Sequence, residues 1–259
     1  MANFSGRLSK APVVYALCQI RFSPILKMSE MVADIQEKLR DSYEGFEEER
    51  LTGIHVPSQG QPTVQGDVRW RFESSDKRSG YILQNGSLVY HTTAYRDFDQ
   101  FVPEVLHGFD VVANIAKVQR VQRIGLRYVD LIQGDDTHGV EQFLHPQLRG
   151  FGAELEGVSE QLSQYVFVGA TSLGQLVIRV TRARHEFILP PDLLPLALVA
   201  ERKASVERPS VFLDTDHFVE RAETPIDRSD VERVVRDLKM QISSAFKKAI
   251  TDEALRAWK

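Results

Sequence analysis

The sequence predicts an α+β protein made of two pseudo-repeated halves, and three observations predict this fold. Ile20–Phe22 and Leu126–Tyr128 are similar apolar runs with an arginine at the centre. Each run is followed by a short helical stretch and by more strand-like sequence. Each half then ends in a long amphipathic stretch, and the apolar positions of the two stretches keep a constant offset from Phe98 and Val231 onward. Each half therefore reads strand, helix, antiparallel strands, long helix.

The first half, residues 1–118, begins with a strand. Pro12–Phe22 is rich in β-branched and aromatic residues, which favours a strand buried on both faces. Ser29 is suited to cap the helix that follows. Polar and apolar residues then alternate over Val64–Phe72, and Asn85-Gly86 is a hairpin turn signal. These patterns predict antiparallel strands.

The second half, residues 119–259, repeats this order. Strand-like runs occur at Val121–Val129, Tyr165–Val168 and Leu176–Val180, and another begins at Val211. A short helix is expected around Val140–Leu144. The second half therefore offers about the same set of elements as the first.

The two long helices have recognisable starts. Asp97 or Asp99 can cap the first, and Ser229 with Glu232 matches a capping box for the second. The aligned apolar positions are Phe98, Phe101, Val105 and Phe109 in the first helix and Val231, Val234, Leu238 and Ile242 in the second. Such stripes bury one face of a helix.

We expect the halves to share one curved antiparallel sheet, with the long helices on one face and the other face open. Two independent domains are the competing layout. No Gly/Ser/Pro-rich linker lies near residue 118, so one compact unit is preferred.

Composition restricts the class of protein. The chain has 259 residues and a net charge of −4, from 32 basic and 36 acidic residues, which argues against a globally basic nucleic-acid binder. No apolar stretch is long enough to span a membrane, and the first residues lack a signal-peptide core. Cys18 is the single cysteine, so it forms no internal disulfide. We expect a cytoplasmic protein.

Arginines alternate with apolar residues on several predicted strands. They are Arg21, Arg69, Arg71, Arg127 and Arg179. If their apolar neighbours pack under the helices, the arginines face the open side of the sheet, because side chains alternate along a strand. They are then candidate binding residues for nucleic acid or a partner protein. Cross-strand ion pairing, with Asp67, Glu73 or Asp130 as partners, is the simpler alternative.

The sharpest enzymatic pattern matches the PD-(D/E)xK signature of Mg²⁺-dependent nucleases. Pro191-Asp192 is followed by Glu201 and Lys203. In that chemistry Asp192 and Glu201 hold Mg²⁺, while Lys203, on the same strand face as Glu201, polarises the attacking water or the phosphate. The pattern is short and matches by chance in many proteins, and Pro195 interrupts the segment. A loop that leads into an apolar strand is the alternative.

A second candidate metal site is Asp214, Asp216 and His217. These residue types bind metal ions, and the two aspartates should share one face of a strand. Aspartates near strand ends also serve turns and helix caps, which is the alternative. The seven histidines show no HExxH spacing, and the chain has no P-loop, no GxSxG and no complete GxGxxG. No cofactor is predicted, except Mg²⁺ under the nuclease hypothesis.

Four segments together resemble a sporadically distributed, uncharacterised bacterial protein family. They are the opening Ala11–Pro24, the central Arg123–Tyr128, Leu213–Asp216 and the final Phe246–Glu253. This chain has Asp130 where that family usually has asparagine. The resemblance spans most of the chain and implies a stand-alone bacterial protein; it implies no activity and no catalytic residue.

Together these observations predict a binding or regulatory module rather than a recognised enzyme. We expect its working surface to be the open sheet face. The ligand would be nucleic acid or a partner protein, in a bacterial defence or toxin-linked setting, and the alternative is the Mg²⁺-dependent nuclease. The sequence does not define the oligomeric state or the role of the acidic loop Asp135-Asp136.

Overall fold

The structure, a computed structural model, describes residues 8–55, 63–150, 156–158, 160–183, 189–194, 196–204, 208–225 and 227–259. Pro195 and the side chain of Asp67, a suggested ion-pair partner, lie outside the described residues. The expected α+β class with an antiparallel sheet is confirmed, because the described strands form one open sheet and every described pairing is antiparallel.

Nine strands make up this sheet. They are β1 (Val13–Phe22), β2 (Gly45–His55), β3 (Thr63–Glu73), β4 (Ser79–Gln84), β5 (Ser87–Thr92), β6 (Arg120–Gln133), β7 (Leu162–Ala170), β8 (Gln175–Ala183) and β9 (Ser210–Pro225). Their order across the sheet is β2-β3-β4-β5-β1-β6-β9-β8-β7. The two arginine-centred strands of the sequence, β1 and β6, are therefore neighbours at the middle.

Five α-helices and two short 3₁₀ helices are described. They are α1 (Met28–Leu39), α2 (Phe98–Ala116), α3 (Val140–Phe143), α4 (Arg228–Ala249), α5 (Asp252–Ala257), η1 (Pro146–Leu148) and η3 (Pro191–Leu193). None of the described helices is both long and apolar enough to cross a membrane.

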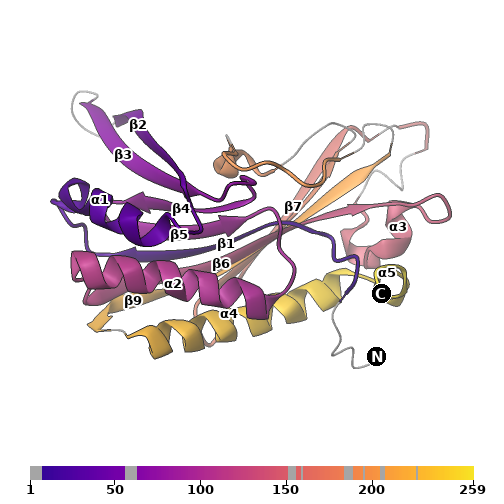
Figure 1. The fold of residues 1–259 in the computed structure, drawn as a ribbon. Coiled ribbons are helices and arrows are strands. Elements are labelled where there is room, and N and C mark those ends of the chain that lie inside the picture. The colour runs from indigo at the N-terminus through magenta and orange to yellow at the C-terminus, as the bar shows by residue number, and fades with distance from the viewer. Residues whose placement is uncertain are drawn as a thin grey trace.

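Helices α1, α2 and α4 lie against one face of the sheet (Figure 1). The apolar stripes expected from the sequence face this core: Phe101, Val105 and Phe109 of α2 and Leu238 and Ile242 of α4 are all buried. In the middle of β1 and β6 the even-numbered residues face the same core, among them Ile20, Leu126 and Tyr128. Cys18 is buried here too, as expected of a small apolar residue, and its burial raises the pKa of its thiol to about 12.

Two helix starts differ from the expectation. Lys27, not Ser29, precedes α1, and its side chain makes no capping hydrogen bond. Asp227, not Ser229, caps α4 by accepting a hydrogen bond from the Asp230 backbone N–H. An aspartate two positions earlier offers the same oxygen acceptor, so the capping-box pattern identified the helix but not its first residue. Asp97 caps α2, as one of the two expected choices.

The opposite face of the sheet is partly covered by the chain between β8 and β9. η3 and its neighbours lie on the side away from the long helices (Figure 1). Leu189, Leu198 and Ala204 pack there against Tyr15 and Phe212 in a separate small core. This segment therefore covers part of the central strands β1, β6 and β9.

At one edge of the sheet, β7 exposes apolar side chains on both faces. Tyr165, Val166, Phe167 and Val168 are each between 44% and 58% exposed. An exposed apolar edge strand offers unpaired backbone groups to another chain. Among the described strands β7 pairs with β8 alone, so its outer side is an apolar edge of the sheet.

Candidate binding groove on the open face of the sheet

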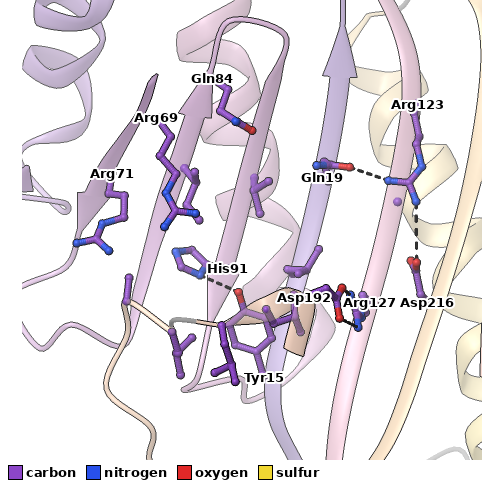
Figure 2. A pocket seen from close by; sticks show the side chains of 18 of the residues that line it. Tyr15, Gln19, Arg69, Arg71, Gln84, His91, Arg123, Arg127, Asp192 and Asp216 are labelled. Carbon is purple, nitrogen blue, oxygen red and sulfur yellow. Dashed lines mark hydrogen bonds and ion pairs between the residues drawn. The ribbon is translucent and has the colours of Figure 1, made fainter. Parts of the chain in front are cut away.

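A groove of about 430 Å³ lies on the open face, between the sheet and the segment around η3. Its lining combines apolar residues of the sheet, among them Leu17, Ile82 and Val89, with leucines of the covering segment and with charged side chains. Figure 2 shows Arg69 and Arg71 on one side and Arg123, Arg127 and Asp216 on the other. The groove therefore combines apolar surface with charged side chains on both sides.

Strand alternation explains why the arginines meet on this face. Residues directly opposite each other in neighbouring strands share a face. One such row joins His91, Leu17, Arg127 and Asp216 from β5, β1, β6 and β9. Gly125 lies in the next row, beside the Arg123 guanidinium, which an added Cβ would meet at 3.3 Å. The parity argument made from the sequence is correct for these strands.

Four of the five predicted binding arginines line the groove, namely Arg69, Arg71, Arg127 and Arg179. Arg21 does not line it and is exposed, although it lies opposite Arg123 in the β1–β6 register. Arg123 lines the groove but was not among the predicted binding residues. The alternation Arg123, Gly125, Arg127 would have placed it on the same face as Arg127.

Arg127 occupies the centre of the charged side of the groove. It donates two hydrogen bonds of 2.7 Å to the Asp214 carboxylate, and its Nη1 and Nη2 donate to Asp192 at 2.5 and 3.2 Å. Burial lowers the pKa of Arg127, but the hydrogen bonds to Asp214 and Asp192 outweigh it, so the net shift is upward. The bond to Arg127 in turn lowers the pKa of Asp192. Arg127 and Asp192 therefore both carry their charge at neutral pH.

Two further arginines surround this centre. Arg179 donates to Asp214 at 3.1 Å and keeps 38% of its side chain exposed. Arg123 donates to Gln19 at 2.6 Å, lies 3.4 Å from Glu220 and 3.9 Å from Asp216, and stacks over the Phe218 ring. Burial raises the pKa of Asp216. Arg179 is the more accessible of the two cations.

Arg69 and Arg71 form the other charged side through pairs within the β2–β3 hairpin. Arg69 pairs with Glu49, and Arg71 pairs with Glu47, with Glu49 at 2.6 Å and with Glu73 at 3.4 Å. The Nε of Arg71 is buried without a hydrogen-bond acceptor among the described residues. This cluster therefore holds one donor that is not satisfied.

Tyr15 and His91 form a neutral pair on the groove floor. The Tyr15 hydroxyl lies 2.9 Å from His91 Nδ1, and His91 is 2% exposed. Burial, together with Arg71 and Arg69, lowers the pKa of His91 to about 3. His91 is uncharged near neutral pH, and sequence spacing gave no sign of this contact.

The alternative of cross-strand ion pairing is also present, so the groove is not a bare cationic stripe. The carboxylates within ion-pair distance of its five lining arginines are Glu47, Glu49, Glu73, Asp192, Asp214, Asp216 and Glu220. Asp130, a suggested partner, instead lies on the helix side. The groove therefore has no surplus of positive charge, and ion pairs hold its arginines in fixed positions.

The nuclease pattern lacks the geometry that it needs. Asp192 lies in η3, and Glu201–Lys203 lies in irregular chain rather than on the expected strand. Asp192 pairs with Arg127, whereas Glu201 pairs with Arg78 at 3.6 Å and Arg96 at 3.5 Å. The two carboxylates therefore pair with different arginines. These ion pairs hold the segment against the sheet.

The second metal hypothesis also separates its residues. Asp214 and Asp216 do share one face of β9, where they contact arginines. His217 points to the opposite face, where its Nδ1 lies 3.2 Å from the Leu238 carbonyl and its Nε2 3.0 Å from Thr171 Oγ1. Consecutive strand residues face opposite sides, which explains the separation. Within the described ranges, no group of three or more acidic, histidine or cysteine side chains is arranged to hold a metal ion.

Comparison of the sequence with protein-family models and with curated proteins finds no match. The resemblance to a bacterial family therefore stays a prediction.

Proposed function

We propose that this protein is a binding module, and that the groove binds an acidic segment of a partner protein. The observation that carries this proposal is the pair between Arg127 and Asp192. Asp192 belongs to an irregular covering segment, is 62% exposed, and offers both carboxylate oxygens to one guanidinium. The groove thus already receives an acidic side chain from a loop, and a partner's loop could present one to Arg179 or Arg69 in the same way.

Charge balance favours a protein over nucleic acid. A phosphate backbone needs a surplus of unpaired cations, because the affinity comes largely from counterion release. The arginines here are outnumbered by the carboxylates that pair with them, which disfavours a polyanion. A ligand with one or two acidic groups, placed against the more exposed arginines, fits better. The exposed apolar strand β7 supports the same choice, since nucleic acid does not pair with a strand edge.

We also propose that the two halves are pseudo-equivalent and form one unit. In the first half the strands run outward from the centre as β1-β5-β4-β3-β2, and in the second as β6-β9-β8-β7. Each order begins with an arginine-centred strand, β1 or β6. The next strand, β5 or β9, is the one that precedes the long helix α2 or α4 in the chain. The main core contains residues of both halves, which supports one compact unit. The cytoplasmic location and the defence or toxin-linked setting remain predictions.

Site-directed photocrosslinking in the producing cells tests the partner proposal. A benzoylphenylalanine at Gln84, which lines the groove, should capture a defined protein. The same probe at Glu30, exposed on α1, is the control for non-specific capture. The double variant Arg69→Ala/Arg179→Ala should abolish capture at Gln84, because it removes cations from both sides of the groove. Arg40→Ala, on α1, should leave capture unchanged.

Two results would contradict the proposal. Capture of nucleic acid at Gln84 that Arg69→Ala/Arg179→Ala abolishes would assign the groove to a polyanion. Capture of the same proteins from both probe positions, unaffected by the arginine changes, would show that the groove selects nothing.

A further inference from the structure

A second cavity, of about 330 Å³, lies on the helix-covered side of the sheet. It opens between the start of the chain, the beginning of α2, strand β6 and helix α4. Its lining is mostly apolar and includes Val13, Phe98, Ile242, Phe246 and Leu255. A cavity of this size and character falls within the range of small-molecule sites.

Charged residues of both signs line this cavity: Asp130 and Lys239, together with Arg96, Asp97 and Lys247. Asp130 and Lys239 are close enough to interact electrostatically, but they do not form an ion pair. Asp130 on β6 is 3% exposed, and its Oδ1 has no hydrogen-bond partner among the described residues. The Lys239 ammonium on α4 lies 4.2 Å from the centre of the Tyr128 ring and 6.0 Å from that of Tyr95. In the part of the chain that the structure describes, neither group forms an ion pair with the other or with a third residue. The Asp130 carboxylate and the Lys239 ammonium are therefore partly desolvated and lie among apolar side chains.

Such an arrangement is costly unless something completes it. A buried carboxylate without a partner loses its hydration, and no protein hydrogen bond or ion pair compensates for that loss. Burial accordingly raises the pKa of Asp130 to about 7 and lowers the pKa of Lys239 to about 8. Each shift favours the neutral form of its group. The aromatic rings beside Lys239 offset part of the cost, since a cation is attracted to a ring face.

We propose that this cavity binds a small zwitterion with an apolar side group, such as an aromatic amino acid. The ligand ammonium would contact the Asp130 carboxylate, and the ligand carboxylate would contact the Lys239 ammonium. The apolar side group would lie against Phe98, Ile242 and Phe246. One ligand then supplies the partner that each charge lacks, and its side group covers the apolar lining.

Simpler ligands satisfy only part of the site. An apolar amine leaves Lys239 without an anion and adds a second cation, while an apolar acid places two carboxylates beside each other at Asp130. A neutral apolar molecule leaves both charges unpaired in a drier cavity. The zwitterion is therefore preferred over all three on charge complementarity. The inference does not depend on the groove, which lies on the opposite face of the sheet.

Three molecules of nearly one shape test the proposal by isothermal titration calorimetry. L-Phenylalanine has both charges, phenethylamine lacks the carboxylate, and 3-phenylpropanoate lacks the ammonium. We expect phenylalanine to bind the wild-type protein at least about tenfold more tightly than either analogue, because each analogue loses a charge-assisted contact. Lys239→Met should remove the advantage of phenylalanine over phenethylamine. Asp130→Asn should remove its advantage over 3-phenylpropanoate.

Lys248→Met, on the same helix but outside the cavity lining, is the matched control and should leave all three affinities unchanged. The wild-type series alone is decisive if a variant fails to fold. Equal affinities for the three molecules, or no binding of phenylalanine, would overturn the proposal. So would a preference for phenylalanine that survives both Lys239→Met and Asp130→Asn.

Discussion

Replacing Arg127 with methionine should destabilise the protein strongly, because Arg127 neutralises a buried carboxylate. The Arg127 side chain is 8% exposed and that of Asp214 only 3%. Methionine has a similar length but no guanidinium, so it removes both 2.7 Å hydrogen bonds to Asp214. Of the described residues that pair with this carboxylate, Arg179 then remains, at 3.1 Å.

The size of the effect follows from burial. Removing one partner of a buried ion pair costs about 3–5 kcal/mol, because the other charge stays desolvated. Since Arg179 still contacts Asp214, we expect the lower end of that range, about 3 kcal/mol. Asp192 is 62% exposed, and Arg127 keeps both hydrogen bonds to Asp214 when Asp192 is changed, so Asp192→Asn should cost only about 0–1 kcal/mol. The two variants therefore separate the buried pair from the exposed one.

Urea unfolding followed by circular dichroism measures these free energies. The double variant Arg127→Met/Asp214→Leu should cost clearly less than the sum of the single changes, because it leaves no unpaired carboxylate. If Arg127→Met costs no more than Asp192→Asn, or if the single changes add fully, the argument that burial makes this pair important is wrong.

Three further changes have predictable outcomes. Folding lowers the pKa of His91 from 6.5 to about 3, so the unfolded state binds a proton at a higher pH than the folded state does. The free energy of unfolding should therefore fall as the pH drops from 6.5 towards 3. Urea melts of His91→Gln should show a smaller fall over the same range. Folding raises the pKa of Asp130 from 3.8 to about 7, so the free energy of unfolding should fall as the pH rises through that range. Asp130→Asn should raise the free energy of unfolding at pH 8 by up to about 4 kcal/mol. If the variant has the same pH profile as the wild type, this account of Asp130 is wrong. Gly108→Ala would place a Cβ 2.2 Å from Tyr81 Cε1. Thermal melts should therefore show that the free energy of unfolding falls by about 1–3 kcal/mol, although alanine usually stabilises a helix relative to glycine. Gly139→Ala is the control and should change little, because nothing lies within 4 Å of the added Cβ.

Much of the fold could be predicted because it depends on local periodicity. The stripes of α2 and α4 identify buried helix faces, since three- and four-residue spacing places side chains on one side of a helix. Alternation likewise predicted which face of β6 Arg127 occupies. Capping was less predictable, because Asp227 and Ser229 are both competent caps and only the path of the chain selects one.

The candidate site was predictable only in part. The faces of Arg69, Arg71, Arg127 and Arg179 follow from alternation, but their carboxylate partners come from other strands and from η3. Arg21 has the same parity and yet lies outside the groove, because position along a strand, and not parity, determines whether a side chain reaches it. The contacts of Asp192 and Glu201 with separate arginines were also beyond sequence reasoning.

Periodic burial acts between residues a few positions apart, so the order of residues alone predicted the two long helices and the face that Arg127 and its neighbours occupy. Strand order, the covering segment over one face and the unpaired Asp130 and Lys239 beneath the other depend on contacts between residues far apart in the chain. The energy of such a contact depends on the burial of both partners at once, and burial exists only after the chain has folded. Tertiary structure alone therefore decided which charges are neutralised and which still lack a partner.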